Sequence, residues 1–163
     1  MSTLPVGEMA SPGDYNEHCT IARTLEIVGE RWTLLILRQS FWGVKRFDQL
    51  QSSLGIARNI LAKRLQTLVG AGILERHRYQ ERPARYEYRL TERGRDLYPV
   101  VLALRKWGDK HATSHVGSPV TLIHKGCGNP LEGVMVCEHC GEPVSARDVS
   151  PIVSEELART ISQ

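Results

Sequence analysis

The sequence has no long apolar run and few aromatic side chains. In its first half, residues 34–37 are the longest purely apolar stretch, far too short to cross a bilayer. The first 14 residues have neither a basic start nor an apolar core, so they do not resemble a secretory signal. Only 6% of the residues are aromatic, which argues against an RNA-binding protein that stacks bases on exposed rings. These absences predict a cytoplasmic protein that does not enter a membrane.

The groupings that an enzyme needs are missing as well. Polar residues are scattered, with no nucleophile beside a base and no metal-ligand set with an open position. The net charge is only +3, whereas a structural chromatin protein would be far more basic throughout. We therefore expect neither an enzyme nor a chromatin-packing protein.

The charges that are present are unevenly distributed. Residues 45–95 contain twelve Lys or Arg against five Asp or Glu, and the flanking segments are mildly acidic. A basic middle segment is typical of a surface that binds a polyanion such as DNA, although a solvated helix face would have the same composition.

Helical periodicity begins at Cys19, and Gly29 ends the first helix. The next helix, residues 31–41, contains the apolar run and is expected at the centre of the core. Two shorter helices follow, residues 47–54 and 56–69, separated by Gly55. Two short helices joined by a tight glycine-containing turn are the elements of a helix-turn-helix. The second of them is expected to turn Ile60, Leu61, Leu65 and Leu68 inward.

A β-hairpin is predicted directly after these helices. Residues 73–79 and 85–90 have the pattern of strands, and apolar and charged residues alternate in the second. A basic hairpin in this position is a wing. Thr91 is then expected to cap a helix that runs through Trp107, with a kink or break at Pro99. The predicted fold class is mainly α with a small β-wing, a winged helix-turn-helix.

One face of the helix over residues 56–69 is polar and narrow enough to approach base edges in the major groove. Arginines at the hairpin and basic residues before the preceding helix are placed to reach phosphates. The expected DNA-contacting residues are Lys45, Arg46, Arg58, Asn59, Ala62, Lys63, Gln66, Arg82 and Arg85. Any one of them alone could be an ordinary exposed residue.

Residues 19–111 resemble the HxlR-type winged-helix regulators of the MarR-like group. The matching stretches are CTIA at 19–22, GERW at 29–32, KRFDQL at 45–50, IARNIL at 56–61, RL at 64–65, GILER at 72–76, YEY at 86–88, LT at 90–91, GR at 94–95 and WG at 107–108. The family often has Cys-Pro where this chain has Cys19-Thr20, and Gly-Lys-Trp where it has Glu30-Arg31-Trp32. Neither change affects the expected fold.

The resemblance implies a homodimer built through the first and last helices of the domain. Such a dimer would bind a pseudo-palindromic operator in double-stranded DNA and act as a repressor, released by a small-molecule or electrophile inducer. Several members of the family sense oxidants through a cysteine at the position of Cys19. A helix N-terminus favours the reactive thiolate, but a small residue packed at the dimer interface is the alternative interpretation. A zinc-containing RNA-binding protein is the competing function.

The remaining cysteines form a separate motif near the C-terminus. His124 and Cys127 are followed by Cys137 and Cys140, each pair with two intervening residues and a glycine directly after it. Four nitrogen and sulfur ligands suit a structural zinc ion with a filled shell. The alternatives are His139 as the fourth ligand, or a redox-active pair formed by Cys137 and Cys140.

The predicted domain organisation has five parts. They are a flexible arm (1–16), the winged domain for DNA binding and dimerisation (17–112), a linker (113–119), a zinc-ribbon-like module (120–149) and a tail (150–163). About 30 residues bury little core, so zinc would supply most of the folding energy of this module.

Overall fold

The computed structural model describes residues 19–112 and 120–152, and it divides into two compact units. One unit contains the described residues 19–30 and 136–152, and the other contains residues 31–112 and 120–135. The expected arm, the linker and residues 153–163 of the expected tail lie outside the described residues. In the part that is described, no helix is long and apolar enough to cross a membrane.

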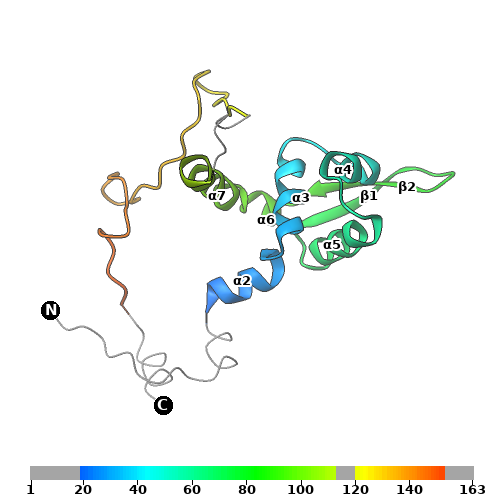
Figure 1. The fold of residues 1–163 in the computed structure, drawn as a ribbon, viewed down its shortest axis with the longest axis horizontal. Helices are drawn as coiled ribbons and strands as arrows, with labels where there is room; N and C mark the ends of the chain where they lie inside the picture. The colour runs from blue at the N-terminus through cyan, green and yellow to red at the C-terminus, as the bar shows by residue number, and fades with distance from the viewer. Residues whose placement is uncertain (1–18, 113–119, 153–163) are drawn as a thin grey trace, which may run out of the picture. The chain divides into compact units, whose positions relative to one another are not determined.

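The second helix of the described chain organises the core. In chain order the elements are α2 (Thr20–Val28), α3 (Arg31–Phe41), α4 (Phe47–Leu54), α5 (Arg58–Gly70), β1 (Leu74–Gln80), β2 (Arg85–Leu90), α6 (Glu92–Arg95) and α7 (Tyr98–His111) (Figure 1). Helix α3 contacts α4, α5, α7 and β2, and its Ile36 and Leu37 are fully buried. The prediction that this helix lies at the centre of the core is confirmed.

A three-residue turn joins α4 to α5. Gly55 ends α4 with φ 61°, a conformation that glycine adopts without steric cost, and its N–H donates to the carbonyl of Gln51 at 2.9 Å. Ile56 follows and is buried, with 2% of its surface exposed. Helix α5 therefore begins at Arg58, two residues later than predicted, because Ile56 anchors the turn instead of starting the helix.

The prediction that Ile60 points inward is wrong. Leu61, Leu65 and Leu68 are buried, whereas 37% of Ile60 is exposed. Successive residues of an α-helix are about 100° apart, so Ile60 lies to the side of the buried leucine stripe.

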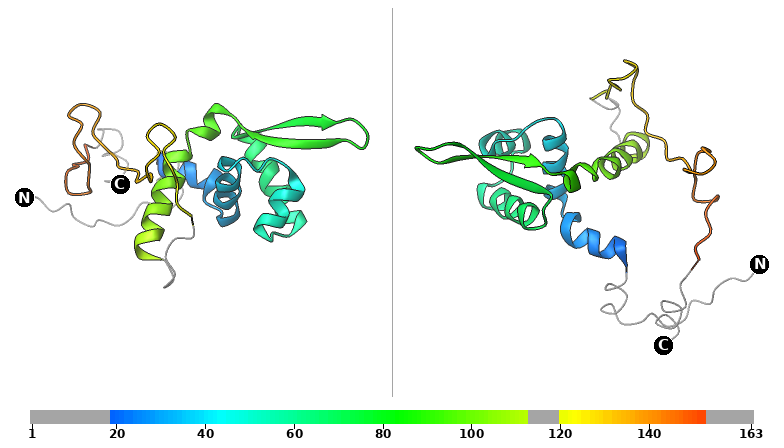
Figure 2. Two further views of the ribbon diagram at one scale, coloured as in Figure 1. Left: turned by 90° about the horizontal axis from the view of Figure 1, so that it is seen from above. Right: turned by 180° about the vertical axis from the view of Figure 1, so that it is seen from behind.

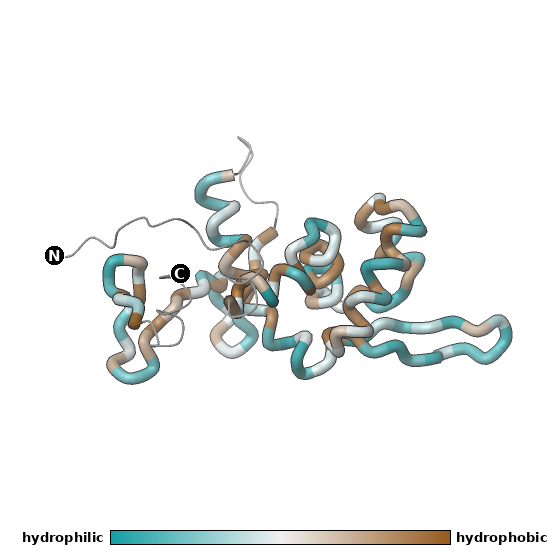
Figure 3. The backbone as a smooth tube through the Cα atoms, turned by 90° about the horizontal axis from the view of Figure 1, so that it is seen from below, coloured by the Kyte–Doolittle hydropathy of each residue, from teal (hydrophilic) through white to brown (hydrophobic). Residues whose placement is uncertain are grey.

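The wing is an antiparallel hairpin that pairs Leu74 with Leu90 and Arg78 with Tyr86. Strand β1 begins and ends one residue later than predicted, because the carbonyl of Ile73 instead accepts the N–H of Thr91 at 3.1 Å. The hairpin extends beyond the ends of α4 and α5 in every view (Figures 1 and 2). Most of its length is coloured hydrophilic (Figure 3), as expected for an arm that is not part of the core.

The helix predicted from Thr91 through Trp107 is interrupted, as expected, near Pro99. The short helix α6 is capped by Thr91, whose hydroxyl accepts the N–H of Gly94 at 3.0 Å. Helix α7 then begins at Tyr98 with Pro99 in its first turn. Proline lacks an N–H and is tolerated in the first turn of a helix, where that donor has no partner within the helix.

Candidate nucleic-acid interface

Helix α5 presents a polar face on the side away from its buried leucines. The residues that the sequence analysis selected there are all exposed: Arg58, Asn59, Ala62, Lys63 and Gln66. Arg58 lies at the start of the helix with its guanidinium 5.0 Å from the centre of the Phe47 ring, so it is held beside the start of α4. The structure therefore brings these five residues onto one surface that combines two amides, a small side chain and two cations.

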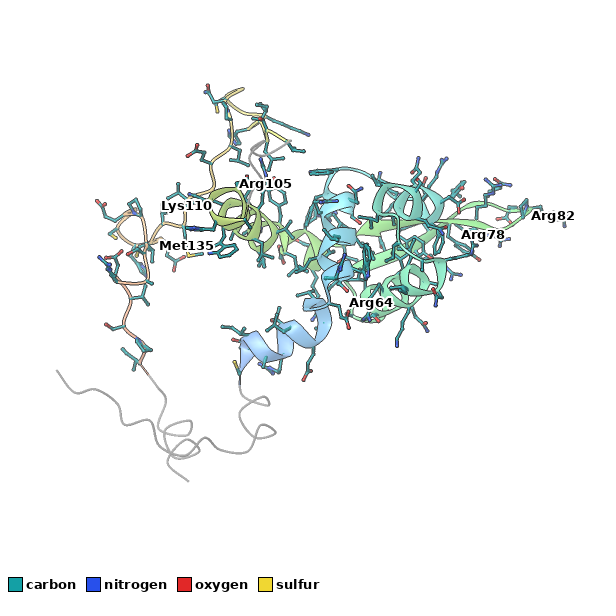
Figure 4. The ribbon with its side chains drawn as sticks, viewed as in Figure 1. Arg64, Arg78, Arg82, Arg105, Lys110 and Met135 are labelled. Carbon is teal, nitrogen blue, oxygen red and sulfur yellow. The ribbon has the colours of Figure 1, made fainter. Side chains whose placement is uncertain are left out.

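The hairpin carries the other predicted cations. Arg82 lies at its far end, beyond Arg78 (Figure 4), and Arg85 begins β2. The guanidinium of Arg78 in β1 is held by the turn, since it donates to the carbonyl of Glu81 at 2.9 Å. Among the described residues, neither Arg82 nor Arg85 has an ion-pair partner, and the same is true of Lys63 on α5. These cations are available to phosphate.

Lys45 and Arg46 fix the hairpin to the start of α4. The carbonyl of Lys45 accepts the N–H of Tyr88 at 2.8 Å. The Arg46 Nε lies 3.3 Å from Oε1 of Glu87, and its guanidinium lies 4.5 Å from the ring centre of Tyr79. Arg46 remains half exposed, so it joins the two elements while its charge stays accessible to solvent.

Glu87 is a residue that the sequence analysis left without a role. Hydrogen bonds from Arg89 and then from Arg46 lower the pKa of its carboxyl group, against an opposing effect of burial. Only 14% of its side chain is exposed although it belongs to the charged side of β2. Glu87 therefore neutralises part of the basic surface and organises two arginines. The separation of 41 positions between Arg46 and Glu87 explains why local patterns did not reveal this pair.

Comparison with known proteins identifies this arrangement. The HxlR-like helix-turn-helix family matches residues 27–116. The chain belongs to the HxlR-like helix-turn-helix family. It is a transcriptional regulator with a DNA-binding helix-turn-helix fold.

The similarity of this HxlR-like regulator to its relatives extends beyond the winged domain. An uncharacterized HTH-type transcriptional regulator of Mycobacterium tuberculosis is 48% identical over 132 residues, 81% of this chain and 84% of the relative. The crystal structure of PA1607, a proposed transcription factor, has a TM-score of 0.75 at 38% identity and covers 85% of this chain and 95% of its own. The redox regulator HypR in its reduced form has a TM-score of 0.55 at 32% identity and covers 58% of this chain and 94% of its own.

Cys19 occupies the N-cap position of α2. Its backbone is extended, with φ −83° and ψ 111°, and its carbonyl accepts the N–H of Arg23 at 3.1 Å. The residue is partly exposed, and its thiol is free in the structure. This placement agrees with the expected position at a helix start, and it leaves both interpretations of the residue in place.

The expected metal ligands of this HxlR-like chain occupy two turns. In the first, Nδ1 of His124 lies 3.3 Å from Sγ of Cys127, and hydrogen bonds from Asn129 lower the pKa of that thiol. In the second, hydrogen bonds from the backbone of Cys140 lower the pKa of the Cys137 thiol. The two turns fall in different compact units. Within residues 19–112 and 120–152, no three His, Cys, Asp or Glu side chains gather as a metal site.

An apolar cavity of about 320 Å³ lies between α3 and α7. Its walls include Leu35, Phe41, Tyr98 and Leu104. Arg38 also lines it, and the Nε of Arg38 is buried with no hydrogen-bond partner among the described residues. A cavity with apolar walls and one buried donor has the character of a small-molecule site.

Proposed function

We propose that this chain is a homodimeric repressor that binds a pseudo-palindromic operator in double-stranded DNA. The observation that carries the proposal is the exposed face of α5 beside a hairpin whose Arg82 and Arg85 have no ion-pair partner among the described residues. Asn59 and Gln66 would read base edges, and the cations would bind phosphates. As a regulator of transcription it would act in the cytoplasm.

Exposed apolar residues on two helices support the dimer. In α7, Val100, Leu104 and Trp107 are 45%, 50% and 63% exposed and follow one another at helical spacing. In α2, Ile21 and Leu25 are 70% and 56% exposed. Contiguous exposed apolar residues mark interaction surfaces, and these are the helices through which the family resemblance implies dimerisation. The two recognition helices would then enter major grooves about one DNA turn apart.

Two features support release of DNA by an inducer. Cys19 would react with an oxidant or electrophile, and the similarity to the redox regulator HypR favours this route. The apolar cavity between α3 and α7 would admit a small molecule beside α7, the helix with the exposed apolar residues. In either case the inducer would change the separation of the two recognition helices.

The test is fluorescence anisotropy of the purified protein on DNA from upstream of its own gene, at several salt concentrations. We expect selective binding with a dissociation constant of about 10⁻⁸ to 10⁻¹¹ M and a steep salt dependence.

Asn59→Ala should weaken the binding free energy by about 1–3 kcal/mol and relax the preference at one base. Lys63→Ala should weaken binding to all duplexes equally, and it should reduce the slope of the logarithm of the binding constant against the logarithm of salt concentration by about one. Lys110→Ala, which removes an exposed lysine of α7, is the control.

A thiol-reactive quinone distinguishes the two inducer routes. Loss of binding in the wild type, with binding retained in Cys19→Ser, would make Cys19 the sensor. DNA binding that is unaffected by the quinone would favour the cavity as the site of the inducer. Binding to single-stranded or structured RNA, with no selective binding to any duplex, would contradict the proposed function and favour the RNA-binding alternative.

A further inference from the structure

The apolar cavity between α3 and α7 is lined by a cation that no described carboxylate neutralises. Arg38 lines the cavity, and its Nε is buried without a hydrogen-bond partner among the described residues. Its guanidinium group forms no ion pair within the described part of the chain. An unpaired donor of a charged group costs free energy when it is buried, so this position favours a ligand that brings an acceptor.

A neighbouring tryptophan holds this guanidinium group in place. The group lies 5.0 Å from the centre of the Trp42 ring, and Trp42 lines the same cavity. The N–H of Trp42 donates to the carbonyl of Arg38 at 3.2 Å, so helical spacing places both side chains on one face. A cation that is already stacked on a ring loses little further freedom when a ligand binds, so the donor is preorganised.

The second arginine of the cavity wall has a different role. The Nε of Arg105, which lies on α7 (Figure 4), is 3.3 Å from Oδ2 of Asp109. The same guanidinium group donates to the carbonyl of Val120. Arg105 therefore holds the chain that follows the winged domain, and Arg38 is the cation that a ligand would meet.

The remaining walls determine the body of the ligand. Phe41 and Tyr98 meet edge to face with their ring centres 5.0 Å apart, and leucines of α3 and α7 complete the lining. The volume of about 320 Å³ is at the lower end of the range for small-molecule sites, roughly 300–1,000 Å³. These features suit a small molecule with one ring or a branched chain and a single anionic group.

One wall comes from residues 120–133, which we call the strap. Leu122 of the strap lines the cavity. Nζ of Lys106 in α7 donates to the carbonyl of Gly133 at 2.8 Å. A Cβ at Gly133 would lie 2.7 Å from Cδ2 of Leu102, so the strap passes directly along α7 (Figures 1 and 2). The helices of the winged domain therefore do not form the cavity alone.

We propose that this cavity binds a small apolar carboxylate. Its anionic group pairs with Arg38, and its apolar body packs against the rings of the wall and against Leu122 of the strap. A carboxylate supplies both the charge and the acceptors that suit a buried guanidinium group. The inference rests on the proposed function for its regulatory meaning, since this ligand would be the inducer that acts beside α7. Binding itself requires neither DNA nor Cys19.

The test is isothermal titration calorimetry of the purified full chain without DNA. The probes are phenylacetate, 3-phenylpropionate and 4-phenylbutyrate, each compared with its neutral amide. We expect saturable binding of at least one acid and weaker binding of its amide. Arg38→Gln should raise the dissociation constant of the acid about 10- to 100-fold and that of the amide less than about twofold. Arg38→Lys, which keeps the charge, should restore part of the affinity.

Arg31→Gln is the matched control for the arginine. Arg31 is exposed on the same helix and lies 4.6 Å from the centre of the Trp32 ring, but it is not among the residues that line the cavity. This substitution should leave the dissociation constants of acid and amide unchanged. Circular dichroism of every variant confirms that the helices still form, so that a general folding failure is recognised.

Leu122→Ala tests the contribution of the strap. It should weaken the binding of acid and amide by the same factor, roughly 3 to 10, because the lost contact is apolar. Ile123→Ala is the control, since the neighbouring Ile123 is 52% exposed and does not line the cavity. Tryptophan fluorescence locates the ligand: a bound acid should change the emission of the wild type, and Trp42→Phe should remove this change while the heat of binding remains.

The absence of saturable binding by all three acids would overturn the proposal, as would equal weakening of acid and amide by Arg38→Gln. Unchanged binding in Leu122→Ala would exclude the strap from the site. Trp107→Glu changes an exposed residue of the proposed dimer face outside the cavity. Acids that bind this variant but not the wild type would overturn the proposal in favour of a second copy of the chain that fills the cavity. Acid binding by a protein that selects no duplex would contradict the proposed function and support the ligand site.

Discussion

Single residues divide the basic surface into cations that are available to DNA and cations that hold the protein together. Arg82 and Arg85 have no ion-pair partner in the described chain, whereas Arg46 and Arg89 share the carboxylate of Glu87. A solvated ion pair contributes little stability, but two arginines around one partly buried carboxylate form a small network. Glu87 therefore fixes the base of the wing and keeps two like charges close together.

Replacing Glu87 tests this role through pH. Because the pKa of Glu87 is lowered in the folded protein, its contribution to stability is present above the unfolded value of about 4.3. That contribution is lost as the pH falls through the lower folded value. We expect Glu87→Gln to melt at a lower temperature than the wild type at pH 7, with the gap narrowing towards pH 3.

Thermal melting followed by circular dichroism between pH 7 and pH 3 measures this gap. The control is Glu81→Gln in the hairpin turn, where 82% of the side chain is exposed. A gap between Glu87→Gln and the wild type that stays constant with pH would contradict the role assigned to the carboxylate.

On α5 the residues of the candidate site were predictable from sequence, because the helix fixes their spacing. The exposed set on α5 follows from helical periodicity, because the buried leucines define the opposite face. The pair of Arg46 with Glu87, and the extra residue at Tyr79 that interrupts the pairing of β1 with β2, depend on strand register between distant segments. No local pattern in the sequence contains that information.

Among the elements, the junction of wing and α6 is the most tightly constrained. The hydroxyl of Thr91 donates to the carbonyl of Gly72 at 2.7 Å and accepts the N–H of Gly94. Gly94 is buried, and a Cβ at this position would overlap the carbonyl oxygen of Ile73. The absence of a side chain is therefore what allows α6 to lie against the start of β1.

Substituting this glycine should destabilise the fold. We expect Gly94→Ala to lower the free energy of unfolding by about 1–3 kcal/mol, because the backbone of Ile73 must move to admit the methyl group. Urea unfolding followed by circular dichroism gives the value. The control is Gly70→Ala at the end of α5, where a Cβ meets no atom within 4 Å and the change should be neutral or stabilising by about 0.5–1 kcal/mol. Equal stability of Gly94→Ala and the wild type would refute the steric argument.

Element boundaries were predictable where glycine or proline sets them. Gly29 and Gly55 end α2 and α4 at the predicted residues, and the break near Pro99 separates α6 from α7. The start of α5 and the orientation of Ile60 were missed, because both depend on how α5 packs in the core. An apolar residue in the turn and an apolar residue beside the leucine stripe cannot be distinguished by periodicity alone.

At the scale of the whole molecule, α7 has two different sides. One side packs against α3 and carries the contacts to Val120 and Gly133. The other side presents Val100 and Trp107, and Leu104, which also lines the rim of the cavity, continues this row; none of the three is buried by a described residue. This division is the physical basis of the proposed dimer.

A charge placed in the exposed row should disrupt that dimer. We expect Leu104→Lys to sediment as a monomer at concentrations where the wild type is a dimer, because a lysine would have to be desolvated at the interface. Binding to a full operator should weaken together with dimerisation, while the circular dichroism spectrum stays unchanged. Lys110→Ala on the same helix should leave the mass unaltered. A Leu104→Lys variant that remains dimeric would exclude this face of α7 from the interface.

The contact between Gly133 and Leu102 has a practical consequence for anyone who prepares the DNA-binding part alone. Ending the polypeptide at residue 112, where α7 stops, would remove the chain that lies on Leu102 and leave Lys106 without its carbonyl acceptor. In this fragment the side of α7 opposite Leu104 would become a second exposed apolar patch. Aggregation of the fragment would therefore not reflect the behaviour of the intact protein. A fragment ending at residue 135 keeps that side covered.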